Sequence, residues 1–222
     1  MPKPARVVIP GLPHHLTHRG NRRLEVFHHV EDYEIYLRLL RKHADRNKVS
    51  LEVYSLMPNH VHLVAVPQNK ESLSDMVQEV HGTFAALLNA KYGMTGHCWE
   101  GRFFSCPLDQ AHFWNTLRYV ELNAVRAGLV KKAEDYSWSS AAAHCGLRDD
   151  RLLAKRLLPA PVMEDWSAWL SSGNSRGIDD YIRAQTFAGH PCGCTDYFRE
   201  IEKSLGRSLL PRPRGRPAKI GK

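Results

Sequence analysis

Residues 49–66 read VSLEVYSLMPNHVHLVAV, two runs rich in β-branched and apolar side chains on either side of Pro58 and Asn59. This pattern is typical of a β-hairpin, in which a tight turn joins two antiparallel strands. Successive side chains of a strand point to opposite faces of the sheet, so His60 and His62 share one face. Two imidazoles held side by side on a strand can bind a divalent cation, so the hairpin also predicts a metal site.

The sequence on both sides of the hairpin alternates between strand and helix patterns. The spacing of apolar side chains predicts a strand at 14–18, a helix at 31–46, the hairpin strands at 49–57 and 60–66, a helix that begins with a capping box at Ser72 and ends by Gly93, a strand at 99–108 and a helix at 110–127. The order βαββαβα predicts an α+β fold, an antiparallel sheet with helices packed mainly on one face.

After residue 130 the pattern becomes helical and poorly periodic. Short helices are predicted at 137–145, 164–170, 178–187 and 195–205, and we expect this segment to dock on the first part of the chain rather than fold alone. Residues 207–222 contain six basic residues, three prolines and no acidic residue, a composition that predicts a disordered cationic tail. The predicted organisation is a first domain at 1–130, a helical extension at 131–206 and a basic tail at 207–222.

The composition favours a nucleic acid as partner. Lys and Arg number 31 against 23 Asp and Glu, which gives a formal net charge of +8 and a pI of about 9.4. A basic protein most often binds a polyanion. The sequence has no run of 18 apolar residues and no apolar signal core at its start, so we expect neither a membrane span nor secretion. Five scattered cysteines do not resemble a disulfide framework, which predicts a cytoplasmic protein.

The helix predicted at 110–127 carries polar side chains that its apolar stripe does not explain. Tyr119 and Asn123 lie one turn apart and about 120° from the centre of the stripe, on the same side as Arg126. The stripe itself consists of Phe113, Leu117, Val120 and Ala124. One interpretation is a solvated face with a half-buried tyrosine. The other is a nucleophile beside a metal ligand.

Combined with the histidine pair, this second interpretation predicts DNA strand transfer. A phenol is a weak nucleophile toward a phosphodiester until a cation neutralises the phosphate and favours the phenolate. Two neutral histidines and one oxygen ligand leave open positions on Mg²⁺ or Mn²⁺ for that phosphate. Attack by Tyr119 conserves the bond energy in a phosphotyrosine link. Two alternatives stay open: a metal-dependent hydrolase that uses a metal-activated water, and a domesticated DNA-binding regulator whose catalytic residues are vestigial.

Four motifs occur together in an order that is specific to one family. They are His18-Arg19-Gly20-Asn21-Arg22-Arg23, Met57-Pro58-Asn59-His60-Val61-His62, Trp99-Glu100-Gly101-Arg102-Phe103 and the run RYVELNAVRAGLV at 118–130. Over residues 10–145 this order resembles that of the HUH single-tyrosine transposases, and in particular the REP-associated tyrosine transposases of bacteria, relatives of insertion-sequence transposases.

The resemblance implies a ferredoxin-like sheet in a catalytic domain at 1–130 and Tyr119 as the nucleophile of a 5′-phosphotyrosine intermediate. It implies His60 and His62 as ligands of Mg²⁺ or Mn²⁺, with Asn123 as a third ligand. The implied partner is single-stranded DNA with hairpins of repetitive extragenic palindromes, and the implied role is DNA transposition at the bacterial nucleoid. Insertion-sequence relatives work as dimers and the REP-associated branch as monomers, so a monomer and a homodimer both fit.

Seven arginines are candidate DNA ligands, because phosphate contacts supply most of the affinity of DNA-binding proteins. They are Arg19, Arg22, Arg23, Arg102, Arg126, Arg214 and Arg216. The segment from Pro213 to Pro217 resembles an AT-hook core, a flat strip that lies in narrow A·T minor grooves. An unspecific cationic tail is an equally good interpretation, and both predict contact with DNA.

Two further features allow more than one interpretation. Trp99 could stack on an unpaired base, whereas Phe103 or Phe104 is expected in the core. His190 near Cys192-Gly193-Cys194 could suggest zinc, but without a second cysteine pair the sequence favours free thiols.

Overall fold

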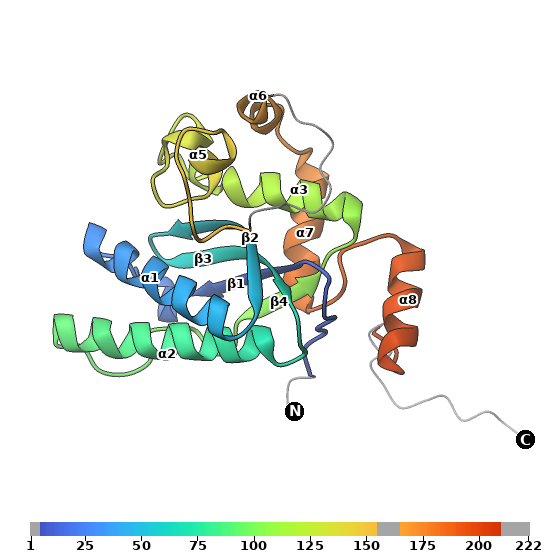
Figure 1. The fold of residues 1–222 in the computed structure, drawn as a ribbon, viewed down its shortest axis with the longest axis horizontal. Coiled ribbons are helices and arrows are strands. Elements are labelled where there is room, and N and C mark those ends of the chain that lie inside the picture. Colours follow the sequence, from blue (N-terminus) through green and yellow to red (C-terminus); the bar gives the residue numbers. More distant parts are fainter. Residues whose placement is uncertain (1–4, 155–164, 210–222) are drawn as a thin grey trace, which may run out of the picture.

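The computed structural model describes residues 5–154 and 165–209, so the greater part of the predicted tail, with Arg214 and Arg216, lies outside the described residues. The elements in chain order are β1 (His14–Arg19), η1 (Asn21–Arg23), α1 (Val30–Arg46), β2 (Val49–Met57), β3 (His60–Pro67), α2 (Ser72–Tyr92), β4 (Phe104–Pro107), α3 (Gln110–Glu121), α4 (Asn123–Arg126), η2 (Ala133–Asp135), α5 (Ala141–His144), α6 (Trp166–Ser171), α7 (Arg176–Ala188) and α8 (Thr195–Leu205) (Figure 1). The first part of this order is the predicted βαββαβα.

The four strands form one antiparallel sheet in the order β2-β3-β1-β4. β1 lies inside the sheet and pairs with β3 on one side and with β4 on the other. In the β1–β3 register, Arg19 lies opposite His60 and Thr17 lies opposite His62. The side chains of these four residues therefore point to the same face. The predicted α+β class with an antiparallel sheet is confirmed.

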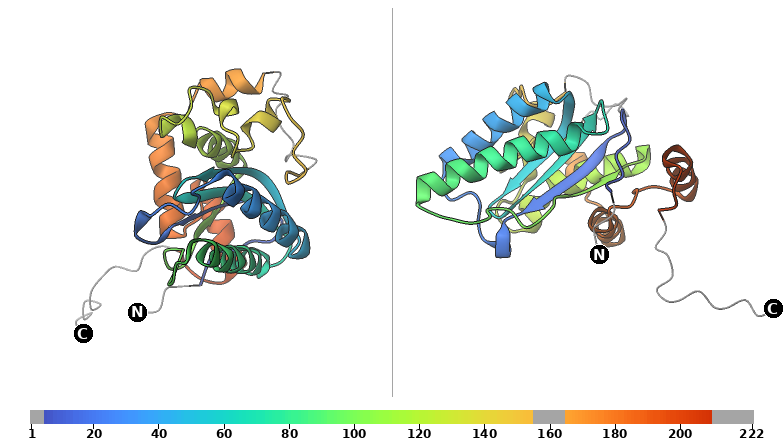
Figure 2. Two further views of the ribbon diagram at one scale, coloured as in Figure 1. Left: turned by 90° about the vertical axis from the view of Figure 1, so that its left-hand side faces the viewer. Right: turned by 90° about the horizontal axis from the view of Figure 1, so that it is seen from below.

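Helices cover both faces of the sheet, so the expectation that they pack mainly on one face is wrong (Figures 1 and 2). On the first face, α1 and α2 form one core cluster with Leu56 and Leu63. On the second face, α3 and α7 form a separate cluster with Val53 and Val64. The reason is that β2 and β3 are buried at nearly every position. Strands that are buried on both sides need a layer of helices on each.

Of the strand predicted at 99–108, the structure has only β4 (Phe104–Pro107). Residues 99–103 form a loop that the backbone ties to the end of β1, where Glu100 N donates to the Arg19 carbonyl at 2.8 Å. Gly101 within this loop has φ +57, a conformation that interrupts a strand. Phe103 is buried in the first core cluster, as predicted, and Trp99 is buried there too.

The helix predicted at 110–127 is divided into α3 and α4. Leu122 separates them with φ −79 and ψ 1, a conformation outside the regular helix. Neither proline nor glycine marks the break, so the sequence carries no signal for it. Asn123 begins α4, and Gly128 with φ +71 follows its end.

Of the helices after residue 130, α6 and α7 pack on the second face. Trp166, Leu170 and Ile182 belong to the same core cluster as Phe113 and Leu117 of α3. The last helix, α8, lies away from the sheet (Figures 1 and 2). In the described part of the chain, no helix is long and apolar enough to cross a membrane.

Candidate active site

A cavity of about 150 Å³ lies on the face of the sheet that α3 and α7 cover. Its walls are His15, Thr17 and Arg19 of β1, His60 and His62 of β3, Tyr119 and Asn123 of the α3–α4 segment, and Arg183, Thr186 and Phe187 of α7. The predicted nucleophile and the three predicted metal ligands therefore lie around one space.

Tyr119 is buried, with 4% of its surface exposed, so the interpretation as a solvated helix face is wrong. Its ring meets the rings of His15 and His62 edge-on, with centroid distances of 5.8 and 5.7 Å. α7 packs against this side of α3 and places Arg183 and Thr186 in the same cavity. The polar side of α3 is thus the wall of an enclosed site.

Two guanidinium groups lie beside Tyr119. Tyr119 is the main cause that raises the pKa of Arg183, and both side chains line the cavity. The guanidinium carbon of Arg126 lies 4.3 Å from the centre of the Tyr119 ring. Positive charge at these positions stabilises the negative charge that a phenol oxygen develops when it attacks a phosphate.

A chain of hydrogen bonds from α7 to β3 fixes the tautomer of His62. Thr186 Oγ1 donates to the Ile182 carbonyl at 2.7 Å, so it accepts from Nδ1 of His15 at 2.8 Å. His15 then has its proton on Nδ1, and its Nε2 accepts from Nδ1 of His62 at 2.9 Å. By this network, the lone pair on Nε2 of His62 stays free.

His60 is held in the same tautomer by its neighbour in the turn. Asn59 Nδ2 donates to the Arg23 carbonyl, which directs Asn59 Oδ1 to Nδ1 of His60 at 2.6 Å. Burial lowers the pKa of His60 to about 4, with a further contribution from Arg19, and burial lowers the pKa of His62 well below its ordinary value. Both imidazoles are therefore neutral at pH 7 and have a free Nε2, the state in which histidine binds a metal.

The contacts of Asn123 leave it less free to bind a metal than the two histidines are. Its Oδ1 accepts a hydrogen bond from Arg126 at 3.0 Å, and its Nδ2 is buried without a partner among the described residues. A carbonyl oxygen has two lone pairs, so one remains for a ligand. Within the described ranges, no three His, Cys, Asp or Glu side chains converge as a metal site. The His60–His62 pair fits a divalent ion that completes its shell with oxygen ligands.

Of the predicted DNA-binding arginines, one lines this cavity and a second contacts Tyr119 and Asn123 of its wall. Arg19 is one of its lining residues. Arg126 donates to the Tyr119 carbonyl oxygen and lies 3.3 Å from a carboxylate oxygen of Asp179 on α7. Arg126 therefore fixes the α3–α4 segment, in addition to placing a positive charge over the tyrosine ring.

The remaining described arginines of that prediction lie elsewhere. Arg22 and Arg23 are exposed in η1, with φ of 55 and 64, directly after β1. Arg102 is exposed and lines a different cavity, on the other side of the sheet. The structure does not bring it to the catalytic cavity.

Sequence patterns did not point to His15, Arg183 or Thr186. His15 shares the strand alternation of Thr17 and Arg19, but only the pairing of β1 with β3 shows that this face is the one that carries His60 and His62. α7 lies far along the chain, and its approach to β1 has no local signal. Cys192 and Cys194 form no disulfide; Cys192 is buried and Cys194 is exposed.

Comparison with known proteins connects this site to a family. Residues 9–123 match the model of the family described as Transposase IS200 like. The structure of a REP-associated tyrosine transposase bound to a REP hairpin has the same fold: TM-score 0.55, 18% identity, 71% of this chain and 100% of that chain covered. A Deinococcus radiodurans R1 protein assigned as a transposase gives a TM-score of 0.38 and 22% identity over 54% of this chain and 95% of its own. No curated protein matches the sequence at a significant level.

Proposed function

The chain belongs to the IS200-like transposase family, and on this basis we propose that it cleaves and rejoins single-stranded DNA through a covalent bond to Tyr119. The observation that carries the proposal is the cavity in which Tyr119 meets two neutral histidines with free Nε2 atoms. Hairpin DNA is the proposed substrate, because the transposase of the same fold is bound to a REP hairpin and this chain has a net charge of +8.

In the proposed reaction the Tyr119 oxygen attacks the phosphorus of a phosphodiester. A bond forms between phosphorus and the tyrosine oxygen while the bond from phosphorus to the 3′ oxygen breaks. Tyrosine loses its proton and the departing 3′ oxygen gains one, which leaves a 5′-phosphotyrosine and a free 3′ hydroxyl. Attack of a 3′ hydroxyl on this link restores a phosphodiester, and no external energy source is needed because one ester replaces another.

The chain's own residues prepare this step in three ways. Arg183 and Arg126 stabilise negative charge on the tyrosine oxygen and ring. Arg19 supplies positive charge for the phosphate at the opposite wall. His15 accepts a hydrogen bond from Nδ1 of His62, which leaves Nε2 of His62 free for a ligand. Tyr119, His60 and His62 of the same chain line this cavity together, so we propose that the tyrosine acts at the histidines of its own copy.

His60 and His62 would hold Mg²⁺ or Mn²⁺, and Asn123 is the proposed third ligand. When bound, such an ion withdraws electron density from the scissile phosphate and makes phosphorus easier to attack. The chain prepares for it by keeping both imidazoles deprotonated through burial. The hydrogen bonds on Nδ1 hold both rings in the orientation that ligation requires.

A labelled hairpin oligonucleotide with single-stranded flanks tests the proposed function. With Mn²⁺ present, a label at the 3′ end should become attached to the protein and resist boiling in detergent, whereas a label at the 5′ end should be released on a shorter strand. Tyr119→Phe should abolish both products. Tyr197→Phe is the matched control, because the Tyr197 hydroxyl is buried, has no hydrogen-bond partner among the described residues and lies outside the cavity.

Two outcomes would contradict the proposal. Cleavage that survives in Tyr119→Phe would show that water is the nucleophile and that the protein is a metal-dependent hydrolase. Hairpin binding without cleavage in any divalent ion would show a DNA-binding regulator whose catalytic residues are vestigial.

A further inference from the structure

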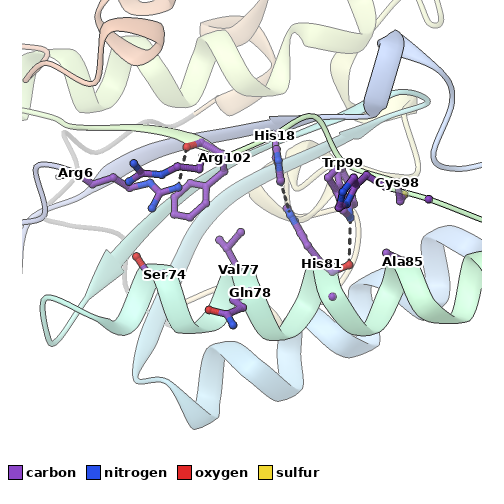
Figure 3. A pocket seen from close by; sticks show the side chains of 15 residues that line it. Arg6, His18, Ser74, Val77, Gln78, His81, Ala85, Cys98, Trp99 and Arg102 are labelled. Carbon is purple, nitrogen blue, oxygen red and sulfur yellow. Dashed lines mark hydrogen bonds between the residues drawn. The ribbon is translucent and has the colours of Figure 1, made fainter. Parts of the chain in front are cut away.

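A second cavity, of about 440 Å³, lies on the opposite face of the sheet, between α2 and the loop that precedes β4 (Figure 3). Its volume is within the usual range for sites that hold a small organic molecule. The lining includes basic, amide and aromatic side chains but no aspartate or glutamate. A space of this chemistry offers many hydrogen-bond donors and suits an anionic ligand with a ring.

One end of this cavity can bind the anionic part of a ligand. Arg6 and Arg102 lie side by side there (Figure 3). The Arg6 guanidinium is fixed 3.6 Å above the centre of the Phe103 ring and donates to the Phe103 carbonyl at 3.1 Å. Burial and the charge of Arg102 lower the pKa of Arg6 to about 10, so Arg6 is still charged at pH 7. Two adjacent cations without a carboxylate in the lining form a site for a phosphate.

The other end of the cavity contains a buried polar atom without a good partner. His18 is 7% exposed and bonds through Nδ1 to Nδ1 of His81 at 2.6 Å. Among the described residues, its Nε2 has only the backbone of Glu100 and Gly101 nearby and no hydrogen bond of normal geometry. His81 is itself held by the Tyr36 hydroxyl at 2.8 Å, and Trp99 stacks on both histidines. Leaving such a nitrogen unsatisfied costs free energy, which a ligand with a polar edge would recover.

We infer that this cavity binds one unpaired nucleotide of the DNA strand on which Tyr119 acts, with its phosphate at Arg6 and Arg102 and its base at the His18 end. The inference rests on the proposed function, because it takes single-stranded DNA as the ligand. It assigns Arg102, which the sequence suggests as a DNA ligand, to a site separate from the catalytic cavity.

A third cavity connects the two sites around the edge of the sheet. It measures about 270 Å³, shares Arg6, Arg102 and Phe103 with the nucleotide cavity, and shares Phe187 with the catalytic cavity. Phe187 is 43% exposed and meets Phe104 of the edge strand β4 edge-on at 4.9 Å. Exposed aromatic rings are platforms for unpaired bases. One DNA strand therefore has a path from Tyr119 past Phe187 and around β4 to the second face.

Two independent variants test the nucleotide cavity. Gly82 of α2 is one of its lining residues, and a Cβ atom at this position would meet nothing within 4 Å. Gly82→Trp should therefore fill the cavity, and Gly82→Ala is its control. The double variant Arg6→Ala with Arg102→Ala removes the phosphate site. Its control is Arg38→Ala with Arg41→Ala, which removes the same charge from exposed positions of α1.

The measurement is fluorescence anisotropy without divalent metal, on a blunt hairpin and on the same hairpin with unpaired flanks. The wild-type protein and both controls should prefer the flanked hairpin by about tenfold, the effect of one stacked base and its phosphate. Gly82→Trp and the Arg6/Arg102 variant should lose this preference but bind the blunt hairpin as the wild-type protein does. Circular dichroism confirms that each variant is folded.

Several outcomes would overturn the inference. It is wrong if Gly82→Trp keeps the full preference, if the Arg6/Arg102 variant behaves as its control does, or if the wild-type protein shows no preference. These results leave the proposed function intact, because the covalent product at Tyr119 is measured separately. A protein that binds the flanked hairpin as inferred but forms no covalent product contradicts the proposed function alone.

Discussion

Thr186 is not a proposed metal ligand, but it affects the proposed ligand His62 through a hydrogen bond to His15. Its hydroxyl accepts a hydrogen bond from Nδ1 of His15, and this bond determines which nitrogen of His62 is free. Valine has nearly the same shape without the hydroxyl. In Thr186→Val the Nδ1 of His15 would lose its acceptor, and His62 would populate both tautomers.

We expect Thr186→Val to weaken Mn²⁺ binding by about tenfold, the usual effect of losing a partner that orients a metal ligand. Isothermal titration calorimetry without DNA measures the affinity. The ¹⁵N chemical shifts of His62 should show a second tautomer, a change that a role in packing alone would not produce. Thr83→Val, at an exposed position of α2, is the control. Unchanged affinity together with a single His62 tautomer would contradict this prediction.

At the residue scale, the features that could be predicted from the sequence are those that depend on the periodicity of a single strand or helix. Strand alternation pointed to His60 and His62, the offset from the apolar stripe of its own helix pointed to Tyr119, and the structure places all three around one cavity. His15 could not be found in this way. Its partner Thr186 is 171 positions away, and nothing in either local pattern indicates that β1 and α7 meet.

At the scale of single elements, β2 contains an irregularity with an energetic consequence. The pairing with β3 shifts register between Leu51 and Val53. The residue between them, Glu52, is 3% exposed, and its Oε2 has no hydrogen-bond partner in the part of the chain that the structure describes. Burial raises the pKa of Glu52 to about 7, and the charge of His144 opposes this. Because the folded-state pKa lies above the ordinary value of 4.5, the folded protein binds more protons than the unfolded chain between these values. The free energy of unfolding therefore falls as the pH rises through this range.

Glu52→Gln should remove this pH dependence. Between pH 5 and pH 8 the wild-type protein should lose on the order of 2 kcal/mol of unfolding free energy relative to the variant. Urea denaturation at both pH values measures the difference. Glu31→Gln, at an exposed position of α1, should follow the wild-type protein. Equal pH dependence in Glu52→Gln and the wild-type protein would show that the carboxyl is ionised in the fold at both pH values.

Element boundaries followed from the sequence where the periodicity was local and uninterrupted. The hairpin strands, α1 and the end of α2 at Gly93 agree with the predictions closely. The packing of helices on both faces was missed, although the signal was present. Residues 60–66 are apolar on both faces beyond the histidines, which is typical of a strand covered on two sides. The break at Leu122 has no such signal in the sequence.

At the scale of the whole molecule, Glu121 joins the segment after residue 130 to α3, the helix that carries Tyr119. Its carboxylate is fully buried at the end of α3. It accepts hydrogen bonds from Ser140 at 2.6 Å, His144 at 2.6 Å and the Trp166 indole at 2.8 Å. The proposed helical extension therefore shares polar contacts as well as an apolar cluster with α3.

We expect Glu121→Ala to lower the free energy of unfolding by about 3–5 kcal/mol, because it leaves buried donors without a partner. The protein should still unfold in one transition, with tryptophan fluorescence and far-ultraviolet circular dichroism coinciding. Asp196→Ala, which removes an exposed pair with Arg199, should change stability by less than about 1 kcal/mol. Two separate transitions in the wild-type protein would show that the extension is stable by itself.

The position of β1 inside the sheet restricts how this protein can evolve. The side chains of β1 alternate between the two faces of the sheet. His15, Thr17 and Arg19 line the cavity at Tyr119, and His18 lines the cavity on the other face. An insertion or deletion of one codon in this strand would exchange the two faces and remove the side chains from both sites at once. The two cavities therefore cannot diverge independently through β1. Insertions tolerated during descent should accumulate in the loops and helices around the sheet, and new DNA preferences should arise from substitutions in α2 and α7.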